Sequence, residues 1–190
     1  MTKQLAIKHL LNYENILSVN ESTQTVPKQP GLYAIFIREP KKLPDQFKKL
    51  LTLQNTKLIY VGKASIDLHK RLIKQDLKHQ GPSTFFRSLG AVLGYRPPFG
   101  SLRNINNKNN YKFNREDTKK IITWIDNNLC VSWYELDRPE TIEPNIIKHL
   151  KPAFNLKYNP NAITELYILR SECKKIACSN IYRETHYIEI

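Results

Sequence analysis

The sequence predicts an α+β protein with a small, mainly antiparallel sheet of three strands flanked by helices. Three short segments are rich in β-branched and aromatic residues, which is typical of strands. Other segments carry apolar residues at helical spacing. The two kinds of segment do not alternate regularly, as they would around a parallel sheet, so the pattern favours an α+β class over a doubly wound one.

The three strands are expected at residues 31–37, 57–61 and 130–136. The first reads Gly-Leu-Tyr-Ala-Ile-Phe-Ile and begins at a Pro-Gly pair. The second reads Lys-Leu-Ile-Tyr-Val and ends at Gly62, and the third alternates as a half-buried strand does. A helix is expected between the first two strands, inserted after Pro40 and Pro44 break the chain.

Helices are expected where apolar residues recur at helical spacing. Asp45 can cap the inserted helix, and Gly81-Pro82 ends the helix that follows the second strand. Residues 18–30 are polar and are interpreted as a linker, and the Asn-rich residues 104–114 as a loop. The expected helices lie near residues 5–13, 45–51, 67–79, 116–127, 144–150 and 162–178.

A chain of 190 residues predicts one domain with appendages. An N-terminal helix and linker, residues 1–28, precede a core domain at residues 29–158. The core domain is expected to carry insertions at about residues 38–56 and 83–128. Residues 159–190 are interpreted as a C-terminal helical extension that packs on the core.

The composition excludes several classes of protein. The 30 Lys and Arg residues exceed the 17 Asp and Glu residues, and the net charge of +13 predicts a polyanionic partner. The longest apolar run, residues 32–37, is too short to span a membrane, and the N-terminus lacks the features of a secretory signal. Three scattered cysteines favour neither a disulfide framework nor a zinc site, so a cytoplasmic protein is expected.

Two Tyr-Gly elements stand on the first two expected strands, and an arginine follows on the next helix. A glutamate, a proline and an asparagine come much later in the chain. In chain order these residues are Gly31, Tyr33, Tyr60, Gly62, Arg71, Glu143, Pro152 and Asn155. Their types, order and spacing resemble the GIY-YIG endonuclease superfamily, in which a Gly-Ile-Tyr strand pairs with a Tyr-Ile-Gly strand. The resemblance covers residues 31–155.

The resemblance implies a metal-dependent endonuclease that hydrolyses phosphodiester bonds of DNA. Tyr33 would lie close to the nucleophilic water and help to activate it, and Tyr60 would position that water or the phosphate. Arg71 would bind the scissile phosphate and stabilise its developing charge. Glu143 would hold a single divalent ion, Mg²⁺ or Mn²⁺, because hard cations prefer oxygen ligands. Asn155 would brace the site rather than react.

The helix that carries Arg71 departs from the family pattern at one position. Many members have a Tyr or His one helical turn after the arginine, where this chain has Gln75, and an amide cannot act as a base. On an α-helix Arg71, Gln75 and His79 are successive i, i+4 neighbours. His79 is therefore a candidate substitute, or else a surface histidine at a helix end.

The segment from Phe85 to Asn114 interleaves basic and aromatic residues and is the candidate for substrate recognition. Basic side chains can neutralise phosphates, aromatic ones can stack or wedge, and asparagines can read base edges. The candidate nucleic-acid-binding residues are Lys63, Lys70, Arg87, Arg96, Arg103, Lys108 and Lys112, with Phe86, Tyr95, Phe99 and Tyr111 as candidate aromatic contacts. DNA is the expected partner, and RNA stays open.

Each of these residues also has a structural interpretation. The two tyrosines can be ordinary sheet aromatics, and Arg71 a cation on a solvated helix face. Glu143 can complement a helix dipole, and Asn155 can turn the chain after a proline. The alternative hypothesis is therefore a catalytically inactive module that keeps the fold and binds DNA or RNA.

Overall fold

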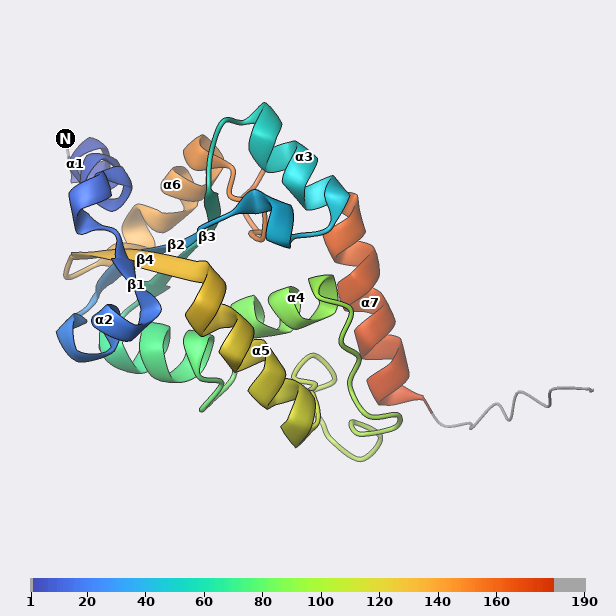
Figure 1. The fold of residues 1–190 in the computed structure, drawn as a ribbon. Helices are drawn as coiled ribbons and strands as arrows, with labels where there is room; N and C mark the ends of the chain where they lie inside the picture. Colours follow the sequence, from blue (N-terminus) through green and yellow to red (C-terminus); the bar gives the residue numbers. More distant parts are fainter. Residues whose placement is uncertain (1, 180–190) are drawn as a thin grey trace, which may run out of the picture.

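Residues 2–179 are described by a computed structural model, and the fold is α+β, as the sequence predicts (Figure 1). The described part contains one antiparallel sheet of four strands in the order β1-β4-β2-β3. The strands are β1 (Leu17–Ser18), β2 (Gly31–Ile37), β3 (Leu58–Ala64) and β4 (Leu129–Glu135). The three expected strands are all present, with β3 extending three residues further than predicted.

The expectation of three strands was wrong by one. β1 pairs with β4 through only two residues, Leu17 opposite Val131 and Ser18 opposite Cys130. A strand is recognised in a sequence by the alternation of apolar and polar residues over several positions. Two residues are too few to show that alternation.

The helices of the described residues pack around the sheet, and one of them is a π-helix. Three short 3₁₀ turns occur at Tyr13–Asn15, Pro40–Lys42 and Pro139–Thr141. The longer helices are α1 (Thr2–Leu11), α2 (Val19–Thr25), α3 (Asp45–Leu53), the π-helix η3 (His69–Leu77), α4 (Thr84–Val92), α5 (Arg115–Asn128), α6 (Glu143–Leu150) and α7 (Thr164–Cys178).

Two segments were interpreted wrongly from the sequence. The expected linker contains α2, which begins at a capping box: the Ser18 hydroxyl accepts a hydrogen bond from the Glu21 amide, and the Glu21 carboxylate accepts one from the Ser18 amide. The start of the expected recognition segment is α4, whose side chains Phe85 and Phe86 are fully buried. Tyr111 is buried as well, so Phe86 and Tyr111 are core residues and not wedges for a nucleic acid.

Strand β2 divides the core into two parts because successive side chains of a strand point to opposite faces. Tyr33, Ile35 and Ile37 face a large core that includes residues of η3, α4 and α5. Leu32, Ala34 and Phe36 face a smaller core with residues of α1 and α6. Figure 1 shows α1 and α6 on one side of the sheet and α4 and α5 on the other.

The regular register between β2 and β3 determines which way Tyr60 faces, and a β-bulge lies directly before it in β3. Ile35 of β2 pairs with Tyr60, but the next residue, Phe36, pairs with Leu58, so Ile59 is the extra residue of the bulge. Residues directly opposite each other in a sheet share a face. Tyr60 therefore lies on the same face as Ile35 and Tyr33, and its side chain joins the large core.

The C-terminal helix α7 packs against α4, and its buried residues Leu166, Cys173 and Ala177 join the large core. Residues 180–190, the end of the expected C-terminal extension, lie outside the described residues. Among the described helices, none has the length and apolar character that crossing a bilayer would require.

The capping box at the start of α2 can be tested by Ser18→Ala. The substitution removes the hydroxyl that accepts from the Glu21 amide, so we expect the free energy of unfolding to fall by about 1 kcal/mol. Urea denaturation measures this change. Ser171→Ala, at an exposed position of α7, is the matched control and is expected to change stability by less than about 0.5 kcal/mol. Equal effects of the two substitutions would contradict the capping role.

Candidate active site

Tyr33 and Tyr60 lie side by side on the same face of β2 and β3. Their ring centroids are 6.3 Å apart, and both side chains are buried. Gly62 is the cross-strand partner of Tyr33, and a Cβ atom at this position would overlap the phenol ring. The glycine of the second Tyr-Gly element is therefore required because the Tyr33 ring lies across its backbone.

The π-helix η3 brings Arg71 and Asp76 onto one face. In an α-helix, residues five apart point about 140° away from each other, because each residue turns the helix by about 100°. In a π-helix, hydrogen bonds run from residue i to i+5, so such residues lie nearly above one another. Arg71 Nη1 is accordingly 3.0 Å from Asp76 Oδ1.

Asp76 is fully buried and joins three donors. Its Oδ2 accepts a hydrogen bond from the Tyr33 hydroxyl, and its Oδ1 accepts one of 2.6 Å from the Ser83 hydroxyl in addition to the contact with Arg71. Burial raises the pKa of Asp76, while Arg71, Ser83 and Tyr33 act in the opposite direction. Burial and the Asp76 carboxylate raise the pKa of Tyr33 well above its usual value, so Tyr33 is a protonated donor in the resting site.

Arg71 remains charged and partly accessible. Burial acts to lower the pKa of Arg71, but Tyr33, Asp76 and Tyr60 raise it, and the net direction is upward. Nη1 also donates to Gln75 Oε1 at 3.1 Å and to the backbone oxygen of Pro82 at 3.3 Å. The side chain is 26% exposed, which leaves part of the guanidinium within reach of a ligand.

Glu143 is the first residue of α6, directly before Pro144, and its side chain is only 14% exposed. Its Oε2 lies 3.3 Å from Lys63 Nζ at the end of β3. Burial raises the pKa of Tyr60, and the Asp76 and Glu143 carboxylates raise it further, while Arg71 and Arg170 oppose them. Both carboxylates are thus near enough to Tyr60 to raise its pKa. We call Tyr33, Tyr60, Arg71, Asp76 and Glu143 the candidate active-site cluster.

Asn155 bonds to the outer edge of β3. The side-chain oxygen of Asn155 accepts from the Val61 amide at 2.9 Å, and the side-chain nitrogen donates to the Val61 carbonyl at 2.8 Å. Because β3 is an edge strand, these backbone groups have no strand partner on that side. The buried amide therefore fixes the backbone between Tyr60 and Gly62.

His79 lies apart from the cluster. It follows η3 with a left-handed backbone (φ 52°), and its ring stacks on Phe86 with centroids 4.1 Å apart. Burial, followed by Lys112 and Arg87, lowers the pKa of His79 to about 4. Both ring nitrogens are buried without a hydrogen-bond partner in the described part of the chain. The structure therefore places His79 in a packing position at the helix end.

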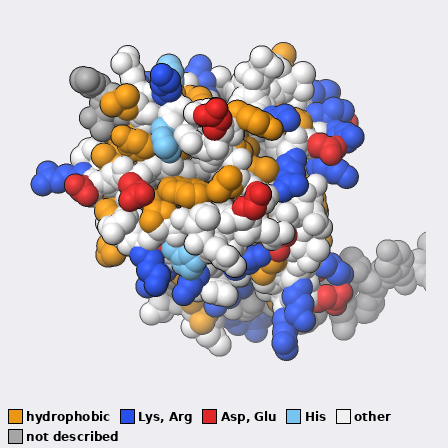
Figure 2. Space-filling view, turned by 60° about the vertical axis from the view of Figure 1, so that its left-hand side comes forward, with side chains coloured by type: hydrophobic (Ala, Val, Ile, Leu, Met, Phe, Trp, Pro, Cys, Tyr) orange, Lys and Arg blue, Asp and Glu red, His pale blue; other side chains and the backbone are white. Residues whose placement is uncertain are grey.

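The predicted nucleic-acid-binding residues differ in exposure. Lys70, Arg103 and Lys112 are exposed, while Lys63, Arg96 and Lys108 are half-buried. Arg96 pairs with Glu172, and Lys108 caps the backbone oxygens of Leu102 and Arg103. Arg87 is buried in α4. On the face of Figure 2, Lys and Arg side chains surround a band of apolar ones and are not gathered into one patch.

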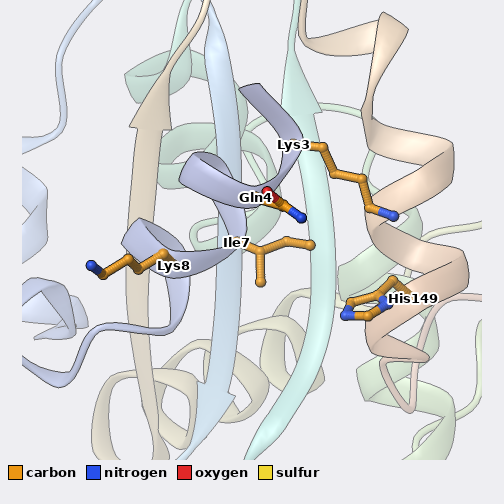
Figure 3. A pocket seen from close by; sticks show the side chains of 5 residues that line it. All are labelled: Lys3, Gln4, Ile7, Lys8 and His149. Carbon is orange, nitrogen blue, oxygen red and sulfur yellow. The ribbon is translucent and has the colours of Figure 1, made fainter. Parts of the chain in front are cut away.

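A shallow pocket lies elsewhere, between α1 and α6, and is lined by Lys3, Gln4, Ile7, Lys8 and His149 (Figure 3). These helices cover the face of the sheet opposite to Tyr33. None of its five lining residues belongs to the candidate active-site cluster.

The described elements follow the order implied by the sequence. Two paired strands present the tyrosines, the next helix carries the arginine, and a later helix begins at the glutamate. A family model described as the GIY-YIG catalytic domain matches residues 31–175, and the chain belongs to this family. The family comprises nucleases, which generally use divalent metal ions. Neither a curated protein nor a solved structure matches this chain.

The position of His79 can be tested through the pH dependence of stability. The unfolded chain binds a proton on His79 near pH 6.5, whereas the folded protein binds it only near pH 4, so stability falls as the pH drops through this window. We expect His79→Asn to lose less unfolding free energy between about pH 7 and pH 5 than the wild type. Asn tolerates the left-handed backbone. Urea denaturation at both pH values measures the difference, and equal losses would contradict the buried, neutral ring.

Proposed function

We propose that this protein is a metal-dependent endonuclease that hydrolyses phosphodiester bonds of DNA. The observation that carries the proposal is the buried network of Tyr33, Asp76 and Arg71, with the Tyr60 ring beside Tyr33, in a chain of the GIY-YIG family. Glu143, at the start of α6, contacts Lys63 of the strand that carries Tyr60. Hydrolysis of a phosphodiester needs an activated water, stabilisation of charge on the phosphate and help for the leaving oxygen. The cluster contains a group suited to each of the first two tasks.

Tyr33 is assigned to the water. Because the Tyr33 hydroxyl donates its proton to Asp76, the lone pairs of the phenol oxygen are left to accept a hydrogen bond. When the water attacks, its proton passes to the Tyr33 oxygen and the phenol proton passes to Asp76. Burial raises the pKa of Asp76, which makes this carboxylate a better proton acceptor than an exposed one. Tyr60, on the same face, positions the water or the phosphate.

Arg71 is assigned to the scissile phosphate. Its contact with Asp76 fixes the guanidinium before substrate arrives, so little reorganisation is needed when charge develops on the phosphate oxygens. A guanidinium is suited to this task because its planar fork matches two oxygens at once.

Glu143 is the candidate ligand of a divalent ion. No cluster of three or more His, Cys, Asp or Glu side chains suited to a metal occurs in residues 2–179. The donor fits Mg²⁺ or Mn²⁺, which take oxygen ligands and commonly bind through one carboxylate plus water and substrate phosphate. When bound, the ion would supply positive charge to the phosphate oxygens. The Nζ atom of Lys63 lies 3.3 Å from Glu143 Oε2, and we assign Lys63 to the same phosphate.

Glu143→Gln is the first test of this assignment. We expect cleavage of DNA in the presence of Mg²⁺ or Mn²⁺ to fall by at least roughly 100-fold, because the amide is a poor ligand for a hard cation. Conversion of supercoiled plasmid to nicked and linear forms measures the rate. Glu140→Gln, on an exposed turn close by, is the matched control and should cleave like the wild type. Wild-type protein that binds DNA or RNA but cuts no form of either would instead identify the inactive binding module.

The second test is a double-mutant cycle of Tyr33→Phe and Asp76→Asn. If the two groups form one proton path, each single substitution should lower the rate constant of cleavage by about 100-fold or more, and the double substitution should add little. Single-turnover cleavage measures these rates, and thermal denaturation checks that each variant is folded. Independent, multiplicative losses would contradict a shared proton path.

A further inference from the structure

Two arginines from different helices meet beside the candidate active-site cluster. Arg87 lies on α4 and Arg170 on α7, far apart in the chain. Their guanidinium carbons are 5.9 Å and 6.0 Å from the centroid of the Tyr111 ring. Both contact Thr84, the exposed first residue of α4, so the pair lies at the end of a helix where the backbone dipole favours anions.

Neither arginine has an acidic partner among residues 2–179. Arg87, with only 7% of its surface exposed, donates to the neutral oxygens of Asn110 at 2.5 Å and Thr84 at 3.5 Å. Arg170 donates to the Ser88 hydroxyl at 2.9 Å and to the Thr84 carbonyl at 3.4 Å. The Nε atoms of both side chains are buried without any hydrogen-bond partner. Two buried Nε–H groups thus lack an acceptor among the described residues.

This pair concentrates positive charge next to the cluster. Burial lowers the pKa of Arg87, and the nearby Arg170 and Arg71 lower it further. Arg170 also acts to lower the pKa of Tyr60, so Arg170 lies close to the cluster itself. Asp76 raises the pKa of Arg87, but this carboxylate is already bonded to Arg71. Buried cations without counter-ions are costly, and an anion bound between them would remove that cost.

We propose that Arg87 and Arg170 form a second phosphate subsite, which binds a backbone phosphate of the nucleic acid next to the scissile one. Guanidinium groups suit this ligand because their N–H donors match phosphate oxygens in charge and geometry. The claim that this phosphate belongs to a nuclease substrate rests on the proposed function. The claim that the site binds a phosphate anion does not depend on it. Arg170 lies within the matched residues 31–175, so the subsite is part of the catalytic domain.

The test follows the Nε–H signals of the arginines by NMR while inorganic phosphate is added to the full chain. We expect the signals of Arg87 and Arg170 to shift to saturation with phosphate but not with chloride at the same ionic strength. Arg170→Gln should weaken the response of Arg87 by at least roughly tenfold, and Arg170→Lys, which keeps the charge but loses the fork, should weaken it less. Lys175→Gln removes one exposed charge from the same helix and should leave the titration unchanged.

The proposal is overturned if the two Nε–H signals ignore phosphate, if chloride shifts them equally, or if Arg170→Gln leaves the titration of Arg87 intact. Cleavage kinetics separate this failure from failure of the proposed function. Saturable phosphate binding by a wild type that cuts no DNA supports the subsite and refutes the nuclease. If the enzyme is active, Arg170→Gln should raise KM for DNA more than it lowers kcat. The same substitution should reduce the salt dependence of DNA binding by a slope of about one. An unchanged KM and an unchanged salt slope would count against the subsite.

Discussion

The buried carboxylate of Asp76 is the interaction on which the candidate site depends. It joins Tyr33 of β2, Arg71 of η3 and Ser83 before α4, three parts of the chain that no other single residue of the cluster links. A buried charge is tolerated only when its lone pairs are satisfied, and these donors satisfy both oxygens. The arrangement also requires the π-helix, because an α-helix would turn Asp76 away from Arg71. The polar network around Asp76 therefore depends on the π-helical backbone of η3.

The sheet supplies the other half of the site with little freedom to move. The pairing of Ile35 with Tyr60 directs Tyr60 to the face of Tyr33, Gly62 makes room for the Tyr33 ring, and Asn155 holds the edge of β3. Each tyrosine is thus positioned by backbone pairing and not by a loop. Groups held in this way are suited to catalysis that depends on preorganisation.

Much of this could be predicted from the sequence, and the exceptions have physical reasons. Local composition predicted the three longer strands and the inserted helix, and α2 could have been found from the Ser18 and Glu21 capping pattern. Asp76 was missed because helical spacing was assumed to be that of an α-helix, which also made His79 a candidate. The burial of Arg87 and its meeting with Arg170 follow from the packing of α4 on α7, a contact between distant segments that periodicity does not reveal.

The hydroxyl proton of Tyr33 offers the most direct measurement of the Asp76 interaction. In proton NMR spectra we predict a downfield signal that exchanges slowly with water, disappears in Tyr33→Phe and moves when Ser83→Ala removes the hydrogen bond to the other oxygen of Asp76. Such a signal would show that the buried carboxylate holds the phenol. A Tyr33 hydroxyl that exchanges as fast as that of the exposed Tyr13, or that ignores Ser83→Ala, would contradict it.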